Sequence, residues 1–110
     1  MKKKRSWTAR AAVYSGRRDP VWPVSEADAV GLVKLWERLE SFQGARPKAP
    51  PLGYRGCSLE SDKGERWEAF GGVVWSGEAM RADPDGVFEK SVLKTAPVAL
   101  GIRSLRSRLG

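Results

Sequence analysis

The sequence predicts a single small α+β domain in the order β-α-β-β-α, with a three-stranded antiparallel sheet and both helices on one face of it. Three observations predict this fold class. Residues 7–14 alternate like a half-buried strand, residues 26–42 carry an apolar stripe at helical spacing, and residues 52–75 contain two strand-like runs around a turn. A chain of 110 residues has room for one domain, which we place at 6–102, with basic tails at 1–5 and 103–110.

The first strand, at residues 7–14, is separated from the first helix by a turn-rich stretch at 15–23. Ser25 has the residue type of a helix N-cap, and acidic residues follow in the first turn, where the helix dipole favours them. The apolar stripe is typical of a helix that packs on a core through residues such as Trp36. We expect this helix to run from about 26 to 42 and to end at Gly44.

A β-hairpin is predicted after a stiff, proline-rich loop at 44–51. Its first strand lies at 52–59, its turn at 62–64 and its return strand at 65–75. Trp67 and Trp75 are in phase along the return strand, so we expect both on one face of the sheet. The Gly71–Gly72 pair is interpreted as a bulge or a close backbone approach.

The second helix is predicted to begin with Asp83 as its cap and Pro84 at its first position, and to stop at Pro97. A three-stranded sheet covered on one side has an open face and two free edges. Either feature invites a second copy of the chain, which would make a homodimer, or an extended peptide.

The formal net charge of +7 comes from the two ends of the chain. Residues 2–5 contribute four positive charges and Arg103, Arg106 and Arg108 contribute three, whereas residues 6–102 contain 13 basic and 13 acidic residues. A nucleic-acid-binding domain usually has a basic face on its folded part. We therefore interpret the tails as solvated segments and do not expect nucleic acid as the partner. The alternative is weak, salt-sensitive binding of a polyanion by the tails.

Several kinds of chemistry lack their residues in this sequence. There is no histidine and a single cysteine, Cys57, which excludes Ser-His and Cys-His catalytic pairs, a zinc site and an internal disulfide. No glycine motif for phosphates is present, and we predict no cofactor and no metal. The single cysteine and the lack of a signal peptide or membrane span favour a cytoplasmic protein.

The sequence favours a protein without catalysis, although one enzymatic alternative stays open. A small enzyme, or an essential subunit of an enzyme, could use tyrosine, lysine or carboxylates for proton transfer. Such a protein would act on a peptide.

The remaining candidates for function are arginine and aromatic side chains. Guanidiniums pair with carboxylates, and aromatic faces bind apolar or cationic groups, so this set suits a peptide or its C-terminus. The alternative interpretation is that Arg17 pairs with Asp19 or a helix carboxylate and that the tryptophans belong to the core. The predicted peptide-binding residues are Ser15, Arg17, Trp22, Tyr54, Arg55, Trp67 and Trp75.

Two short motifs resemble those of small accessory proteins from ribosomal-peptide natural-product biosynthesis, of the crocagin-type pyrroloindoline kind. The resemblance rests on Ser15-Gly16-Arg17-Arg18-Asp19-Pro20-Val21-Trp22 and on Leu52-Gly53-Tyr54-Arg55-Gly56. Arg18 stands where the commoner form of the first motif has proline. The resemblance implies a non-catalytic peptide-binding protein that binds a precursor peptide or presents it to a partner biosynthetic enzyme.

Overall fold

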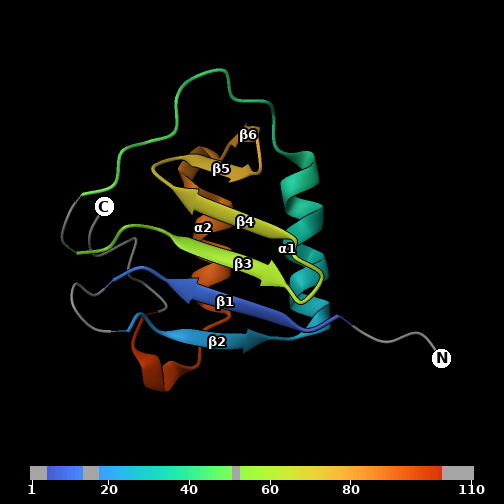
Figure 1. Ribbon diagram of the computed structural model, residues 1–110, viewed down its shortest axis with the longest axis vertical. Coiled ribbons are helices and arrows are strands. Elements are labelled where there is room, and N and C mark those ends of the chain that lie inside the picture. Colours follow the sequence, from blue (N-terminus) through green and yellow to red (C-terminus); the bar gives the residue numbers. More distant parts are fainter. Residues whose placement is uncertain (1–4, 14–17, 51–52, 103–110) are drawn as a thin grey trace.

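The computed structural model describes residues 5–13, 18–50 and 53–102, and within them six strands form one antiparallel sheet (Figure 1). The strand order is β2-β1-β3-β4-β5-β6. The strands are β1 (Trp7–Ala11), β2 (Val21–Val24), β3 (Cys57–Ser61), β4 (Arg66–Phe70), β5 (Val73–Ser76) and β6 (Ala79–Ala82). The helices are α1 (Glu26–Arg38) and α2 (Val87–Lys94), with short 3-10 turns η1 (Pro84–Gly86) and η2 (Val98–Leu100).

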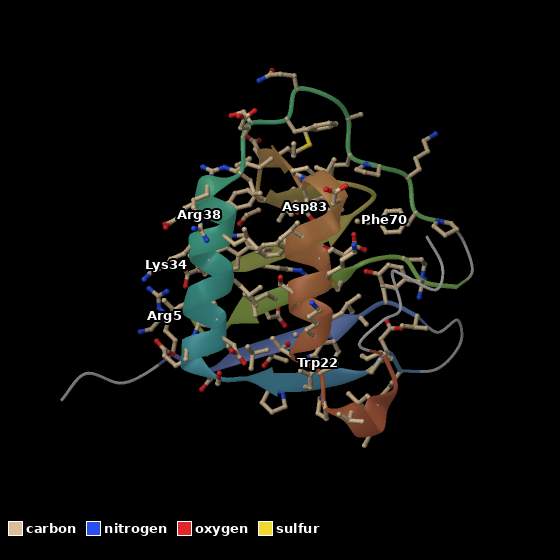
Figure 2. All side chains as sticks on the ribbon, turned by 180° about the vertical axis from the view of Figure 1, so that it is seen from behind. Arg5, Trp22, Lys34, Arg38, Phe70 and Asp83 are labelled. Carbon is tan, nitrogen blue, oxygen red and sulfur yellow. The ribbon has the colours of Figure 1, made fainter. Side chains whose placement is uncertain are left out.

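Both helices lie on one face of the sheet, so the α+β class and the one-sided arrangement are confirmed (Figures 1 and 2). The prediction of a three-stranded sheet was wrong, because the described chain forms six strands. The additional strands are β2, β5 and β6. Strand β2 lies in the stretch interpreted as a turn. Most of β5 falls within the return strand predicted at 65–75, and β6 was not predicted.

Strand β2 contains Pro23, which lies in the stretch predicted to be a turn. Proline is tolerated in a strand at a sheet edge, where its missing N–H would face away from the neighbouring strand. The Ala11 N–H donates to the Pro20 carbonyl at 3.2 Å, and Ala9 lies opposite Trp22. Since inward and outward groups alternate along an antiparallel strand, the nitrogen of Pro23 faces outward. The edge position therefore explains why a strand forms here.

The Gly71–Gly72 pair forms the two-residue turn between β4 and β5 rather than a bulge within one strand. Both glycines have positive φ, at 61° and 87°, as a tight hairpin turn requires. The turn reverses the chain, so that Trp75 lies opposite Glu68 while Ala69 lies opposite Val74. Trp75 consequently lies on the opposite face of the sheet from Trp67, contrary to the prediction.

Helix α1 begins as predicted, with the Ser25 hydroxyl accepting the Asp28 N–H at 3.1 Å. It ends at Arg38 instead of near residue 42, because the chain leaves the helix to run along β6. The Ala82 N–H donates to the Glu40 carbonyl at 2.8 Å, and the Phe42 N–H donates to the Met80 carbonyl at 3.0 Å. Residues 40–42 thus cover the outer edge of β6.

The start of α2 differs from the prediction. The helix begins at Val87 with Gly86 in the N-cap position, and Pro84 opens the separate turn η1 instead of the helix.

The Asp83 side chain nevertheless caps the first turn of α2, as predicted. Its two carboxylate oxygens accept the N–H groups of Phe88 at 2.8 Å and Glu89 at 3.2 Å. Asp83 is only 1% exposed, and its own N–H donates to the Gly72 carbonyl at 2.8 Å. The buried cap therefore joins the start of α2 to the β4–β5 turn.

The core lies between the sheet and the two helices and contains four of the five tryptophans. The rings of Trp7 and Trp67 pack with their centroids 5.9 Å apart. Trp22 lies against the far end of α2 (Figure 2), where its indole N–H donates to the Thr95 hydroxyl at 2.8 Å. Large indoles supply much of the apolar area that so small a domain needs to bury.

Trp22→Phe should lower the free energy of unfolding by about 1–2 kcal/mol more than Trp67→Phe. Both variants lose a similar apolar area, but Trp22→Phe also leaves the Thr95 hydroxyl without its donor. The Trp67 indole N–H has no hydrogen-bond partner among the described residues, so its removal breaks no such bond. Urea unfolding of the two variants measures the difference, and an equal loss in both would contradict this assignment.

Candidate functional site

The predicted site residues are divided between the two sides of the sheet. Trp22 and Trp67 are buried on the helix side, so for these two the alternative interpretation as core residues is confirmed. Tyr54 is buried as well. Arg55 and Trp75 line one hollow on the exposed face. Ser15 and Arg17 lie outside the described residues.

The two motifs that carry the resemblance are joined through residues 12 and 13. The Val13 N–H donates to the Asp19 carboxylate at 2.9 Å, and an Arg55 guanidinium nitrogen lies 3.8 Å from the same oxygen. The backbone of Ala12 completes the connection, because the Arg55 N–H donates to its carbonyl at 2.7 Å and its own N–H donates to the Gly56 carbonyl at 2.9 Å. Asp19 and Arg55 therefore hold the two segments side by side.

Tyr54 belongs to a buried polar cluster with α2 that is not predictable from the local sequence. Its hydroxyl donates to the carboxylate of Glu89, which is 1% exposed, and the Cys57 thiol donates to the Glu89 backbone carbonyl at 3.7 Å. Burial raises the pKa of Tyr54 well above its usual range, and the nearby Cys57 and Glu89 raise it further. Glu89 occupies the third position of the amphipathic helix α2, and nothing in its sequence neighbourhood marks it as buried.

Burial likewise raises the pKa of the Cys57 thiol, with the Glu89 carboxylate adding to the shift. A thiol nucleophile acts as the thiolate, which this environment disfavours. Cys57 is accordingly a core residue of β3, and the cluster ties the Tyr54 segment to α2.

The hollow on the exposed sheet face has a volume of about 70 Å³. It receives side chains from β1, β3, β4 and β5, because residues of one face recur at every second position of each strand. Its lining comprises Arg10, Ala12, Arg55, Gly56, Cys57, Ser58, Arg66, Glu68, Ala69 and Trp75. This volume suits one small group, such as a carboxylate, more than a whole drug-sized ligand.

Trp75 is the one tryptophan of the chain that is not buried. Its indole N–H donates to Glu68 at 2.9 Å, which fixes the ring on the exposed face. The Arg46 guanidinium lies 5.5 Å from the ring centroid and donates to the Gly77 carbonyl at 2.7 Å. An indole held in this way offers a preorganised aromatic surface.

The carboxylates around the hollow already have partners. Glu68 accepts from Trp75 and pairs with Arg66 at 3.3 Å, and Glu60 pairs with Arg66 at 3.5 Å. Arg10 is exposed, and its side chain makes no hydrogen bond or ion pair within the described part of the chain. The hollow therefore has an exposed guanidinium on its β1 side and an indole on its β5 side, which suits a ligand that carries both an anionic and an apolar group.

The chain matches no protein-family model, no curated protein and no solved structure. Among the helices of the described residues, none has the length and apolarity that crossing a bilayer requires.

Stability should fall as the pH rises above the ordinary pKa values of cysteine and tyrosine, 9.0 and 10.0. The unfolded chain loses the Cys57 and Tyr54 protons there while the folded protein retains them, so the free energy of unfolding decreases by up to about 1.4 kcal/mol per pH unit for each group. Tyr54→Phe should be less stable than the native protein at neutral pH and should approach it as the pH rises. Urea unfolding over a pH series tests this, and a stability difference that does not change with pH would contradict it.

Gly56→Ala should destabilise the protein more than Gly53→Ala, although both glycines have positive φ, at 110° and 82°. An added Cβ at Gly56 would lie 2.7 Å from the Ala69 carbonyl oxygen, whereas one at Gly53 would meet nothing within 4 Å. We expect roughly 1 kcal/mol for Gly53→Ala from backbone strain alone and more for Gly56→Ala. Thermal and urea unfolding measure both, and similar losses would show that the contact with β4 is unimportant.

Proposed function

We propose that the protein is a non-catalytic peptide-binding protein and that its binding site is the hollow on the exposed sheet face. The observation that carries the proposal is the convergence of Arg10, Arg55 and Trp75 on one open surface. The structure supports a side-chain site there, because the indole is fixed by Glu68 and Arg46 and the guanidinium of Arg10 is exposed. Following the resemblance, the ligand we propose is a precursor peptide that a partner biosynthetic enzyme modifies.

The peptide would be recognised through its side chains or C-terminus rather than by strand addition. Residues 40–42 already pair with β6, and the outward nitrogen of Pro23 in β2 has no hydrogen to donate. A carboxylate of the peptide would pair with Arg10, and an adjacent aromatic or apolar side chain would pack on Trp75. A second copy of this chain is a competing occupant of the same face.

A second candidate function is the binding of single-stranded nucleic acid by the same face. The hollow is lined by Arg10 and Arg66, and Arg46 lies over the Trp75 ring. Proteins that bind single strands use such guanidiniums for the phosphates and aromatic rings for stacking with the bases. The basic tails would strengthen such binding, and its affinity would fall steeply with salt. Peptide binding by a carboxylate and an aromatic side chain is less sensitive to salt.

The experiment that separates these functions is a fluorescence titration, because Trp75 is the tryptophan that a ligand on the exposed face can reach. The probes are a short peptide ending in an aromatic residue with a free carboxylate, its C-terminal amide, and a DNA oligonucleotide. We expect saturable binding of the free-acid peptide that persists at moderate salt and weakens about tenfold in the amide.

Arg10→Gln should weaken binding of the free-acid peptide to the level of the amide. The matched control is Lys34→Gln, which removes the same charge from α1 on the helix side (Figure 2) and should leave the affinity unchanged. Equal affinities in the two variants would reject the site. A response to DNA alone that vanishes with salt would favour nucleic acid, and turnover of a precursor peptide by the purified protein would favour an enzyme.

A further inference from the structure

A second and larger cavity lies at one end of the molecule, away from the hollow on the exposed face. It has a volume of about 640 Å³ and lies between the end of α1, the β4–β5 turn and the connection from β6 to α2. Its lining comprises Arg38, Leu39, Glu40, Gly71, Gly72, Ala82, Asp83, Pro84 and Asp85. Figure 2 shows Arg38 at the end of α1 and Asp83 at the start of α2, at the same end of the molecule. Pockets that bind small molecules have volumes in this range.

The charges around this cavity are mainly negative. Its lining contains three carboxylates, Glu40, Asp83 and Asp85, and one guanidinium, Arg38. At the C-terminal end of α1, the Arg81 guanidinium donates to the Trp36 carbonyl at 2.7 Å, which offsets the partial negative charge that this helix end would otherwise add. The N–H groups of Phe88 and Glu89, which could otherwise attract an anion to the start of α2, are occupied by Asp83.

The remaining walls are apolar or plain backbone. Leu39, Ala82 and Pro84 contribute apolar surface, and the turn glycines contribute backbone without side chains. Apolar walls with a few converging charged groups are typical of small-molecule sites. Within the described residues no three histidine, cysteine or acidic side chains are grouped as metal ligands, so the acidic lining does not form a metal site there.

We propose that this cavity binds a small organic cation, namely an amine or guanidine on an apolar stem. The cationic head would pair with Glu40 and Asp85, which are both exposed, and the stem would pack on Leu39, Ala82 and Pro84. Arg38 also lines the cavity, and its positive charge would repel the cationic head. This site shares no residue with the hollow on the exposed face, so it does not depend on the proposed peptide binding.

The test is a titration of the full-length protein with n-butylguanidine, followed by the amide signals of Gly71 and Gly72 in nitrogen–proton correlation spectra. Butyramide and butyrate are neutral and anionic controls whose alkyl stem is shorter by one carbon. We expect saturable shifts of the two glycine signals with butylguanidine, and none of comparable size with the controls.

The variants separate the site from the overall charge. Glu40→Gln with Asp85→Asn should weaken binding about tenfold, and asparagine tolerates the positive φ of 58° at position 85. The matched control, Glu37→Gln with Asp62→Asn, removes the same charge from exposed positions outside the cavity and should leave the affinity unchanged. Arg38→Gln should tighten binding, a gain that a merely structural role of the residue would not produce.

Three outcomes would overturn the proposal. They are the absence of glycine shifts with butylguanidine, an equal loss of affinity in the two double variants, and equal binding of butyrate. A guanidinium could come from a small molecule or from an arginine side chain of a peptide, and a capped arginine tripeptide distinguishes the two. If the tripeptide binds and butylguanidine does not, the ligand is a peptide side chain and the proposal of a small molecule is wrong. Unchanged spectra elsewhere in each variant establish that the fold is intact.

Discussion

The six-stranded sheet is covered by helices on one face only, and the other features of the protein depend on this asymmetry (Figure 1). Because side chains of a strand alternate between the faces, each strand contributes one set of residues to the core and another to the exposed face. Trp7, Trp22 and Trp67 belong to the first set, and Arg10, Glu68 and Trp75 belong to the second. The candidate binding residues are those that the alternation leaves outside the core.

The edges of the sheet explain why the exposed face, rather than an edge, is the surface on which we place the peptide. A free edge strand is a template for pairing with another chain, and proteins commonly cover or interrupt it. Here residues 40–42 cover β6, and Pro23 interrupts the outer side of β2. Both features reduce strand addition, so the proposed recognition would depend on side chains.

The two cavities differ in charge as well as in position. The hollow between β1, β3, β4 and β5 has its carboxylates paired and Arg10 exposed, which favours an anionic group. The cavity beside the end of α1 has three carboxylates around it and favours a cationic one. A ligand of one site should therefore be a poor ligand of the other.

The sequence by itself determined the features that depend on neighbouring residues. The Ser25 cap, the Asp83 cap, the turn at 62–64 and the apolar stripe of α1 all rest on contacts within a few positions, and they support the α+β class with two helices on one face. Arg55 and Trp75 were also identified among the candidate site residues from their chemistry alone.

Only the tertiary structure decided the features that depend on partners far along the chain. Pro23 can lie in a strand because β2 is at an edge, and residues 40–42 leave the helical pattern because β6 offers them hydrogen bonds. The turn at Gly71–Gly72 changes the phase of β5, which placed Trp75 on the exposed face and kept Trp67 in the core. The buried pairing of Tyr54 with Glu89 likewise joins residues 35 positions apart. Local sequence carries no information on such partners, because they come together only when the sheet and helices pack.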